Sequence, residues 1–330
     1  YFDHLPTSNN SAYNLSTKAM LKNNTFTTKL DSFFKSSPLE NISGRKNAQI
    51  YFKKFISPNP NSNTIVISTG RTECMTKYKE VIYDLFKNGF SIYIFDHRGQ
   101  GFSSRASQLP NREMGYVENF QYYIDDLKSL YDREINPNNQ NKIFLLSHSM
   151  GGAIGINYIE QFTNDFDKAA FVSPMLGLKF PIELFTNLLY NKDKIKFIPF
   201  NKDYKQSVRP YERNGVTYSK TRYTRQLAAN EENPNTVIGG PTYHWLKQSF
   251  LYMDAAFNNI KKIKTPFILF SAEDESIVDT KAHYKFIEKA NENNIPYKAY
   301  YVENAKHEIL LERDIAKNST ISAILDFFTK

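Results

Sequence analysis

The chain has 330 residues, which allows two ordinary domains or one large domain with an insertion. Hydrophobic residues make up 41% and charged residues 23%, a balance that is too apolar for a disordered chain. The net charge of +8 leaves nucleic acid, a membrane surface and acidic substrates open as partners. The single cysteine, Cys74, excludes an internal disulfide and a zinc site with several thiolates, and no apolar run has the roughly 20 residues of a transmembrane helix.

The first third of the chain becomes regular only gradually. Residues 1–15 are polar and without periodicity, so we expect a loose N-terminus. A weak helical pattern covers 16–35, and strand-like runs at 49–56 and 64–69 flank a turn rich in Asn and Pro. After this point strands and helices alternate. Strands are predicted at 90–96, 142–147 and 169–173, and helices at 76–88, 118–135 and 150–162.

The alternation stops after Ser173 and resumes near Pro266. Strands follow at 267–272 and 297–303, and helices at 279–293 and 314–329. The central strands are apolar throughout, as strands covered by helices on both faces must be. We therefore predict an α/β fold with a mostly parallel, doubly wound sheet, formed by 16–173 and 266–330. Residues 174–265 are interpreted as an insertion that caps the sheet.

Ser149 lies where a predicted buried strand meets a predicted helix, in the run Ser147-His148-Ser149-Met150-Gly151-Gly152. A nucleophile elbow needs this context, because its strained turn pushes the serine hydroxyl out above the sheet. The residues two places to either side must be small. Gly151 meets this condition, whereas Ser147 stands where glycine is usual. We predict that Ser149 is the nucleophile of an intact elbow; the alternative is a serine that only caps the helix.

A serine hydroxyl needs a neighbouring base that an acid holds in place. His307 follows the predicted strand 297–303, and the loop after strand 267–272 contains Glu273-Asp274-Glu275. Because α/β-hydrolases have the chain order serine, acid, histidine, the sequence predicts His307 as the base and an acid in this loop. The remaining histidines are interpreted as structural or incidental: His4, His97, His148, His244 and His283.

Acyl transfer also needs N–H donors for the oxyanion. We expect them from Met150, directly after the nucleophile, and from Arg71, in the glycine-containing loop after strand 64–69. This chemistry requires no metal and no cofactor. Gly99-Gln100-Gly101 lacks the third glycine of a dinucleotide fingerprint, so we do not interpret it as a nucleotide site.

Four segments of the chain together resemble a known family. They are Ile94–Ser103, Ser147–Gly152, Gly239–Trp245 and Ala305–Leu310. In this order they are similar to the α/β-hydrolases of the monoacylglycerol lipase group and, within it, to the bacterial lysophospholipases of the pldB type. The resemblance implies an α/β-hydrolase fold with a helical cap, and a serine esterase that removes the remaining acyl chain of a lysophospholipid.

The resemblance also implies site residues. It supports Ser149 as nucleophile, His307 as base, and Met150 and Arg71 as oxyanion donors. The alternatives for the reaction are a monoacylglycerol lipase or a general carboxylesterase. A catalytically inactive lipid-binding protein on the same fold is the non-enzymatic alternative.

The acid of the triad stays open between two neighbours. In the family it usually lies four residues before the Asp of a Val-Asp pair, and counting back from Asp279 gives Glu275. Asp274 is the alternative, because Asp is the commoner triad acid. We favour Glu275 on register.

The positive charge is concentrated in the predicted cap. Between Lys179 and Arg225 there are eleven basic and four acidic side chains, a local balance of +7, interleaved with aromatic residues. Such a cap could dock on an anionic membrane and receive a single-chain lipid, because basic side chains favour anionic leaflets and aromatic ones the interface. The alternative is a solvated charged face. We do not expect nucleic-acid binding, since no recognised module is present.

Two further expectations follow from the resemblance. Tyr243, His244 and Trp245 either line an acyl or glycerol pocket or pack within the cap. The protein is expected in a bacterial cytoplasm, peripheral at the inner face of the membrane. The chain begins at Tyr1, so a targeting signal upstream cannot be read and an extracytoplasmic location stays open.

Overall fold

The computed structural model describes residues 1–7, 12–179, 191, 193–206 and 209–330. Its strands form one nine-stranded sheet with the order β1-β9-β8-β7-β6-β4-β5-β3-β2. Their bounds are β1 Asp3–His4, β2 Glu40–Ser43, β3 Gln49–Phe55, β4 Thr64–Ser68, β5 Ser91–Phe95, β6 Ile143–His148, β7 Lys168–Val172, β8 Phe267–Ala272 and β9 Tyr297–Val302. Among the strands of the described residues, only the pairs β2–β3 and β3–β5 are antiparallel, so the mostly parallel sheet is as predicted.

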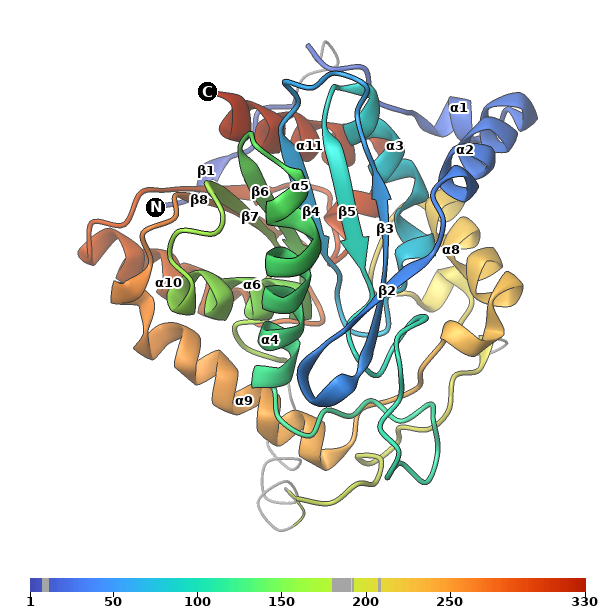
Figure 1. Ribbon diagram of the computed structural model, residues 1–330, viewed down its shortest axis with the longest axis vertical. Helices are drawn as coiled ribbons and strands as arrows, with labels where there is room; N and C mark the ends of the chain where they lie inside the picture. The colour runs from blue at the N-terminus through green and yellow to red at the C-terminus, as the bar shows by residue number, and fades with distance from the viewer. Residues whose placement is uncertain (8–11, 180–190, 192, 207–208) are drawn as a thin grey trace.

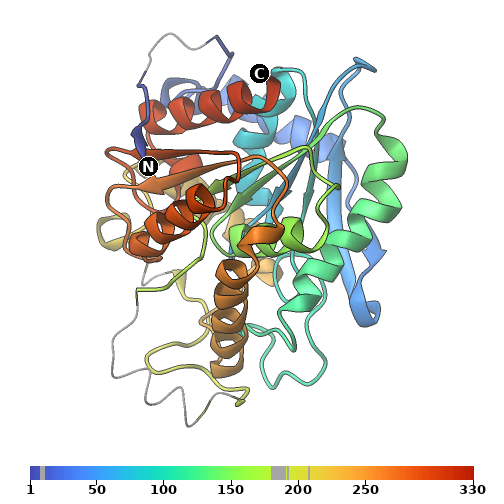
Figure 2. The ribbon, with the colours of Figure 1, turned by 90° about the vertical axis from the view of Figure 1, so that its left-hand side faces the viewer.

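Helices cover both faces of the sheet (Figures 1 and 2). Their bounds are α1 Lys18–Leu21, α2 Asn24–Ser36, α3 Lys79–Lys87, α4 Gln121–Leu130, α5 Asn136–Asn138, α6 Met150–Gln161, α8 Lys220–Glu232, α9 Tyr243–Asn258, α10 Thr280–Glu292 and α11 Asp314–Thr329. Helices α4, α6 and α10 contribute to one core cluster, and α3 and α11 to the other. The central strands are therefore buried on both faces, which explains their continuous apolar sequence.

Alternate side chains of each strand enter different clusters. In β4, Val66 packs on the side of α4 and α6, whereas Ile65 and Ile67 pack on the side of α3. This alternation follows from the period of two along a strand. The parallel strands all present their carboxyl ends at the same edge of the sheet, and the loops that leave this edge hold Ser149, Glu275 and His307.

The N-terminal segment differs from the expectation of a loose end. Asp3 and His4 pair in parallel with Tyr300 and Tyr301 of β9, and Leu5 is buried. Leu15 is buried as well, whereas residues 8–11 lie outside the described part. A two-residue strand carries no periodicity, so its pairing depends on the edge of β9 and could not be read from the sequence.

The predicted helix 16–35 is divided into two. Thr17 caps α1, and Asn23 caps α2 by accepting hydrogen bonds from the N–H groups of Thr25 and Phe26. Asparagine favours such a cap, so a second helix begins there. The predicted helix 118–135 begins at Gln121 as α4 and ends in a π-helical turn, Tyr131–Ile135.

Helices α8 and α9 lie in the described part of the segment between β7 and β8, the segment predicted as the cap. Helix α9 contributes Trp245, Leu246 and Met253 to the core cluster that contains α6. Helix α8 lies next to α3, joined by contacts of Arg222 with Glu80. No helix among the described residues is long and apolar enough to cross a membrane.

Candidate active site

Ser149 stands in the sharp turn between β6 and α6, with φ 53° and ψ −117°. This backbone conformation is strained for a residue other than glycine, as a nucleophile elbow requires. A Cβ on Gly151 would lie 2.2 Å from the backbone oxygen of Ser68, so only glycine fits there. The unusual Ser147 is tolerated because its hydroxyl donates to the backbone oxygen of Ala170 on β7, at 3.2 Å.

The hydroxyl of Ser149 contacts His307, which lies in the loop after β9. His307 Nε2 is 2.9 Å from Ser149 Oγ, and His307 Nδ1 is 2.8 Å from Glu275 Oε2. All three residues are at most 9% exposed. The structure thus brings together the predicted serine, histidine and one of the two candidate acids, from three loops at the same edge of the sheet.

The two candidate acids point to different partners. Glu275 Oε1 accepts hydrogen bonds from the N–H groups of Ile277 (2.9 Å) and Val278 (3.1 Å), which hold its carboxylate toward His307. Burial alone would raise the pKa of Glu275, but the hydrogen bond and charge of His307 and these two N–H groups lower it. Asp274 is exposed and accepts a hydrogen bond from the hydroxyl of Tyr218. Glu275 is therefore the acid that can orient His307.

The loop after β4 runs past the nucleophile. A Cβ on Gly70 would lie 3.2 Å from Ser149 Cβ, so this loop and the elbow are in close contact. Among the described residues, neither the N–H of Met150 nor that of Arg71 donates a hydrogen bond to another protein group. Both proposed oxyanion donors are thus available to a ligand.

The side chain of Arg71 turns toward the segment between β7 and β8. Its Nη1 donates to the backbone oxygen of Gly239 at 2.8 Å, and its guanidinium lies 5.6 Å from the ring centre of Trp245. Burial lowers the pKa of Arg71 to about 10. Because this value is still above neutral pH, the side chain stays charged.

A buried group of side chains that the sequence did not predict supports this loop. Glu73 Oε1 accepts hydrogen bonds from the N–H of Gly70 and the hydroxyl of Tyr78, both at 2.7 Å, and lies 2.7 Å from His148 Nδ1. His148 Nε2 lies 3.2 Å from the backbone oxygen of His307. Glu73 and His148 therefore connect the loop after β4 with the loop that carries the histidine.

Glu73 and His148 each favour the charged form of the other. Burial alone would lower the pKa of His148, but Glu73 raises it, and Lys77 and His148 lower the pKa of Glu73 against the effect of burial. Gln100 also supports the loop, because its Nε2 donates to the backbone oxygens of Gly70 (2.7 Å) and Glu73 (2.9 Å). A carboxylate three residues after Gly70 and a histidine directly before Ser149 are the only sequence signals of this support.

The three residues predicted either to line a pocket or to pack have partners within the protein. Tyr243 and Trp245 are buried in the core cluster on the α6 side, and Trp245 Nε1 donates to the hydroxyl of Tyr123 at 3.2 Å. His244 Nε2 lies 2.8 Å from the backbone oxygen of Glu118. These contacts agree with the packing interpretation.

The basic residues of the 179–225 segment fall into two groups. Arg222 is buried and paired with Glu80 and Asp314, and Lys179 donates to the backbone oxygen of Glu275. These two side chains therefore hold the segment to the core. Most of the others are exposed, while Lys192 and Glu183, together with the aromatic residues Phe180, Phe185 and Tyr190, lie outside the described residues.

Comparisons with known proteins identify the family of the chain. The family model described as serine aminopeptidase, S33, matches residues 59–314. Lysophospholipase L2 of Escherichia coli (strain K12) is 31% identical over 309 residues, which cover 91% of this chain and 90% of that protein.

Solved structures show the same fold. A soluble variant of monoglyceride lipase from Saccharomyces cerevisiae, in complex with a substrate analog, has a TM-score of 0.68 at 21% identity and covers 89% of this chain and 95% of that one. An α/β hydrolase from Novosphingobium aromaticivorans has a TM-score of 0.59 at 12% identity, covering 88% and 98%. The predicted α/β-hydrolase fold and the family resemblance are confirmed.

Proposed function

The chain belongs to the family described as serine aminopeptidase, S33, and on this premise we propose that it is a serine esterase that hydrolyses the acyl ester of lysophospholipids. One observation carries the proposal: His307 lies within hydrogen-bond distance of both Ser149 and Glu275. Nucleophile, base and acid are thus in the order that acyl transfer needs.

In the proposed cycle, His307 Nε2 takes the proton of Ser149 Oγ while this oxygen attacks the acyl carbonyl carbon. The N–H groups of Met150 and Arg71 bind the oxyanion of the tetrahedral intermediate. Glu275 holds His307 in the correct tautomer and stabilises the imidazolium.

The intermediate collapses when His307 returns the proton to the glycerol oxygen, and the glycerophosphodiester leaves. Water then attacks the acyl-serine with His307 again as the base, and the fatty acid is released.

The substrate class rests on the relatives. The 31% identical relative is named a lysophospholipase, which favours a lysophospholipid. A monoacylglycerol is the alternative, because the solved monoglyceride lipase shares the fold. Both substrates present an ester of one acyl chain, so the same triad chemistry would serve either.

The test is fatty-acid release from lysophosphatidylethanolamine, lysophosphatidylcholine and monoolein, with Ser149→Ala as the control. We expect Ser149→Ala to lower kcat by roughly 10⁶-fold. If the wild type and Ser149→Ala release equal amounts of fatty acid from every ester, the proposal of an enzyme is overturned and a lipid-binding protein is favoured. Equal rates on monoolein and on the phospholipids would overturn the phospholipid preference.

We further propose that the exposed part of the segment between β7 and β8 docks on an anionic membrane, at the cytoplasmic face. Phe200 is fully exposed, with a relative accessibility of 103%. Four exposed lysines lie within six residues of it in the chain: Lys194, Lys196, Lys202 and Lys205. An aromatic side chain flanked by lysines suits the boundary between anionic headgroups and acyl chains.

Liposome co-sedimentation tests this docking. We expect binding to phosphatidylglycerol vesicles that weakens as salt rises, and weaker binding by Phe200→Ala and by Lys202→Glu. Binding that ignores both the salt concentration and the charge of the lipid would contradict the proposal.

A further inference from the structure

A cavity of about 480 Å³ lies beside the candidate active site. This volume is within the usual range of small-molecule sites. Thr72, Glu73 and Glu308 line it from the catalytic side, because Glu73 contacts Gly70 and Glu308 follows His307. Arg209 and Arg213 line it from the segment between β7 and β8.

Hydrogen bonds hold the arginine-bearing wall to the loop of His307. The N–H of Glu308 donates to the backbone oxygen of Val216 at 2.8 Å. Lys306 Nζ donates to the backbone oxygen of Asn214 at 3.0 Å. The cavity and the catalytic histidine are therefore joined through neighbouring residues of two loops.

The basic side chains that line the cavity outnumber the acidic ones: Lys77, Arg209 and Arg213 stand against Glu73 and Glu308. Lys77 Nζ lies 2.9 Å from Glu73 Oε2 and 2.5 Å from Glu308 Oε1, so this lysine is shared by the two carboxylates that line the cavity. Glu73 also contacts His148.

The two arginines have no such partner. Within the described part of the chain, neither Arg209 nor Arg213 lies within ion-pair distance of a carboxylate, and both are exposed. Arg209 lies over the ring of Tyr204, 4.7 Å from its centre. Two guanidinium groups are thus left to bind an anion.

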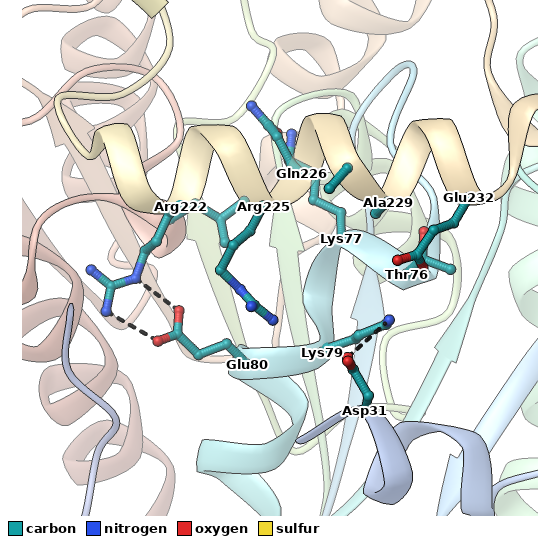
Figure 3. Close-up of a pocket in the computed structure, with 12 residues that line it drawn as sticks. Asp31, Thr76, Lys77, Lys79, Glu80, Arg222, Arg225, Gln226, Ala229 and Glu232 are labelled. Carbon is teal, nitrogen blue, oxygen red and sulfur yellow. Dashed lines mark hydrogen bonds and ion pairs between the residues drawn. The ribbon is translucent and has the colours of Figure 1, made fainter. Parts of the chain in front are cut away.

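A smaller cavity, also lined by residues of α8, contains two ion pairs (Figure 3). Its volume is about 110 Å³, and within it Arg222 pairs with Glu80 and Lys79 pairs with Asp31. Arg225 lines this small cavity and does not line the large one. Arg222 joins α8 to α3, whereas Arg225, like Arg209 and Arg213, has no carboxylate within ion-pair distance among the described residues. Arg225 is therefore a suitable control residue for the larger cavity.

We propose that the large cavity binds the phosphodiester of the lysophospholipid headgroup, with Arg209 and Arg213 as its anion-binding residues. The proposal rests on the esterase function proposed above. The guanidinium fork matches the oxygens of a phosphate. Because only the short glycerol backbone separates the phosphate from the scissile ester, the headgroup subsite must lie close to the nucleophile. Two residues that line the cavity meet this need by their place in the chain, since Thr72 directly follows Arg71 and Glu308 directly follows His307.

The test compares two esters that differ in their headgroup. The variant Arg209→Met together with Arg213→Met is assayed on lysophosphatidylethanolamine and on monoolein, both in micelles of a neutral detergent. We expect kcat/KM on the phospholipid to fall about 100-fold, roughly tenfold for each arginine, and kcat/KM on monoolein to stay within about twofold. An equal loss on both esters, or no loss on the phospholipid, would overturn the subsite.

Arg225→Met is the matched control, and it should leave both values of kcat/KM unchanged. A loss on the phospholipid as large as that of the double variant would attribute the effect to the general charge of α8 and overturn the proposal. If the wild type hydrolyses neither ester, the proposed function itself fails, and this result is distinguishable from failure of the subsite alone.

A second readout separates the headgroup from free phosphate. Glycerophosphoethanolamine should inhibit the wild type competitively, and the double variant much less. Inorganic phosphate at the same concentration should inhibit weakly. Equal inhibition by both compounds would indicate a general phosphate site and contradict a headgroup subsite.

Discussion

The sheet edge with the proposed triad and the cavity wall with Arg209 and Arg213 differ in how their charged side chains are paired. At the sheet edge, Glu275 contacts His307 and Glu73 contacts His148, all four of them buried, and Glu73 also contacts the half-buried Lys77. On the wall, the two arginines are exposed and without a carboxylate partner within the described residues.

In the proposed function, this difference separates the residues of catalysis from those of substrate recognition. A triad must be held in position before the substrate arrives, which requires that its charged groups already have partners. A binding subsite must keep its charged groups unpaired until the ligand supplies the counter-charge.

Removal of the charge of Glu275 should have the largest effect. We expect Glu275→Gln to lower kcat by about 10⁴-fold, because the amide would stabilise neither the correct tautomer of His307 nor its imidazolium. Asp274→Asn should lower kcat less than about threefold, since Asp274 contacts Tyr218 and not His307. Steady-state kinetics on one ester measure both, and the reverse ranking would assign the acid to Asp274.

The buried pair of Arg222 and Glu80 should matter for stability. We expect Arg222→Met to lower the free energy of unfolding by about 3 kcal/mol, because it leaves Glu80 without its bidentate partner. Arg225→Met, three residues further along α8, should change it by less than about 0.5 kcal/mol. Urea denaturation of both variants measures the difference, and equal values would mean that this ion pair does not anchor α8.

The same pair should make stability depend on pH. Burial alone would raise the pKa of Glu80, but Lys317 and Arg222 lower it to about 2. A carboxyl group whose pKa is lower in the folded state stabilises the protein above its unfolded pKa, and this stabilisation is lost as the pH falls toward the folded value.

Between pH 6 and pH 2, the wild type should therefore lose about 3 kcal/mol more stability than Glu80→Gln does. Denaturant unfolding at each pH gives both curves. Parallel curves would show that Glu80 has the same pKa in the folded and unfolded states.

The smallest effect on stability is expected from the arginines of the large cavity. Because Arg209 and Arg213 have no carboxylate partner, Arg209→Met and Arg213→Met should each change the free energy of unfolding by less than about 0.5 kcal/mol. Thermal unfolding measures this change. Marked destabilisation would show that these arginines hold the fold together and would remove the contrast between the two regions.

Local sequence patterns were sufficient to predict most strands of the sheet. The strand β6 and the helix α6 begin and end within one residue of their predicted bounds. A short apolar run followed by glycines predicts such a strand and helix from the local sequence alone. The position of His307 after β9 was likewise predictable, since the chain order of the fold places it there.

Other features depended on residues far apart in the chain. The pairing of β1 with β9 joins residues almost 300 positions apart, and the contact of Glu73 with His148 spans 75. Neither contact leaves a periodic signal, because each involves only one or two residues on each side. The acid is an intermediate case: register favoured Glu275, and its side-chain contacts distinguish it from Asp274.

By itself, the sequence determined the alternation of strands and helices, the elbow around Ser149 and the family of the chain, because these depend on local periodicity, small residues and short motifs. It also located the excess of positive charge between Lys179 and Arg225. Only the tertiary structure decided which of these cations are buried in ion pairs, as Arg222 is. It also decided which of them line a cavity without a carboxylate partner among the described residues, as Arg209 and Arg213 do. The physical reason is that a charge acts through its distance from other charges, and chain order does not specify that distance.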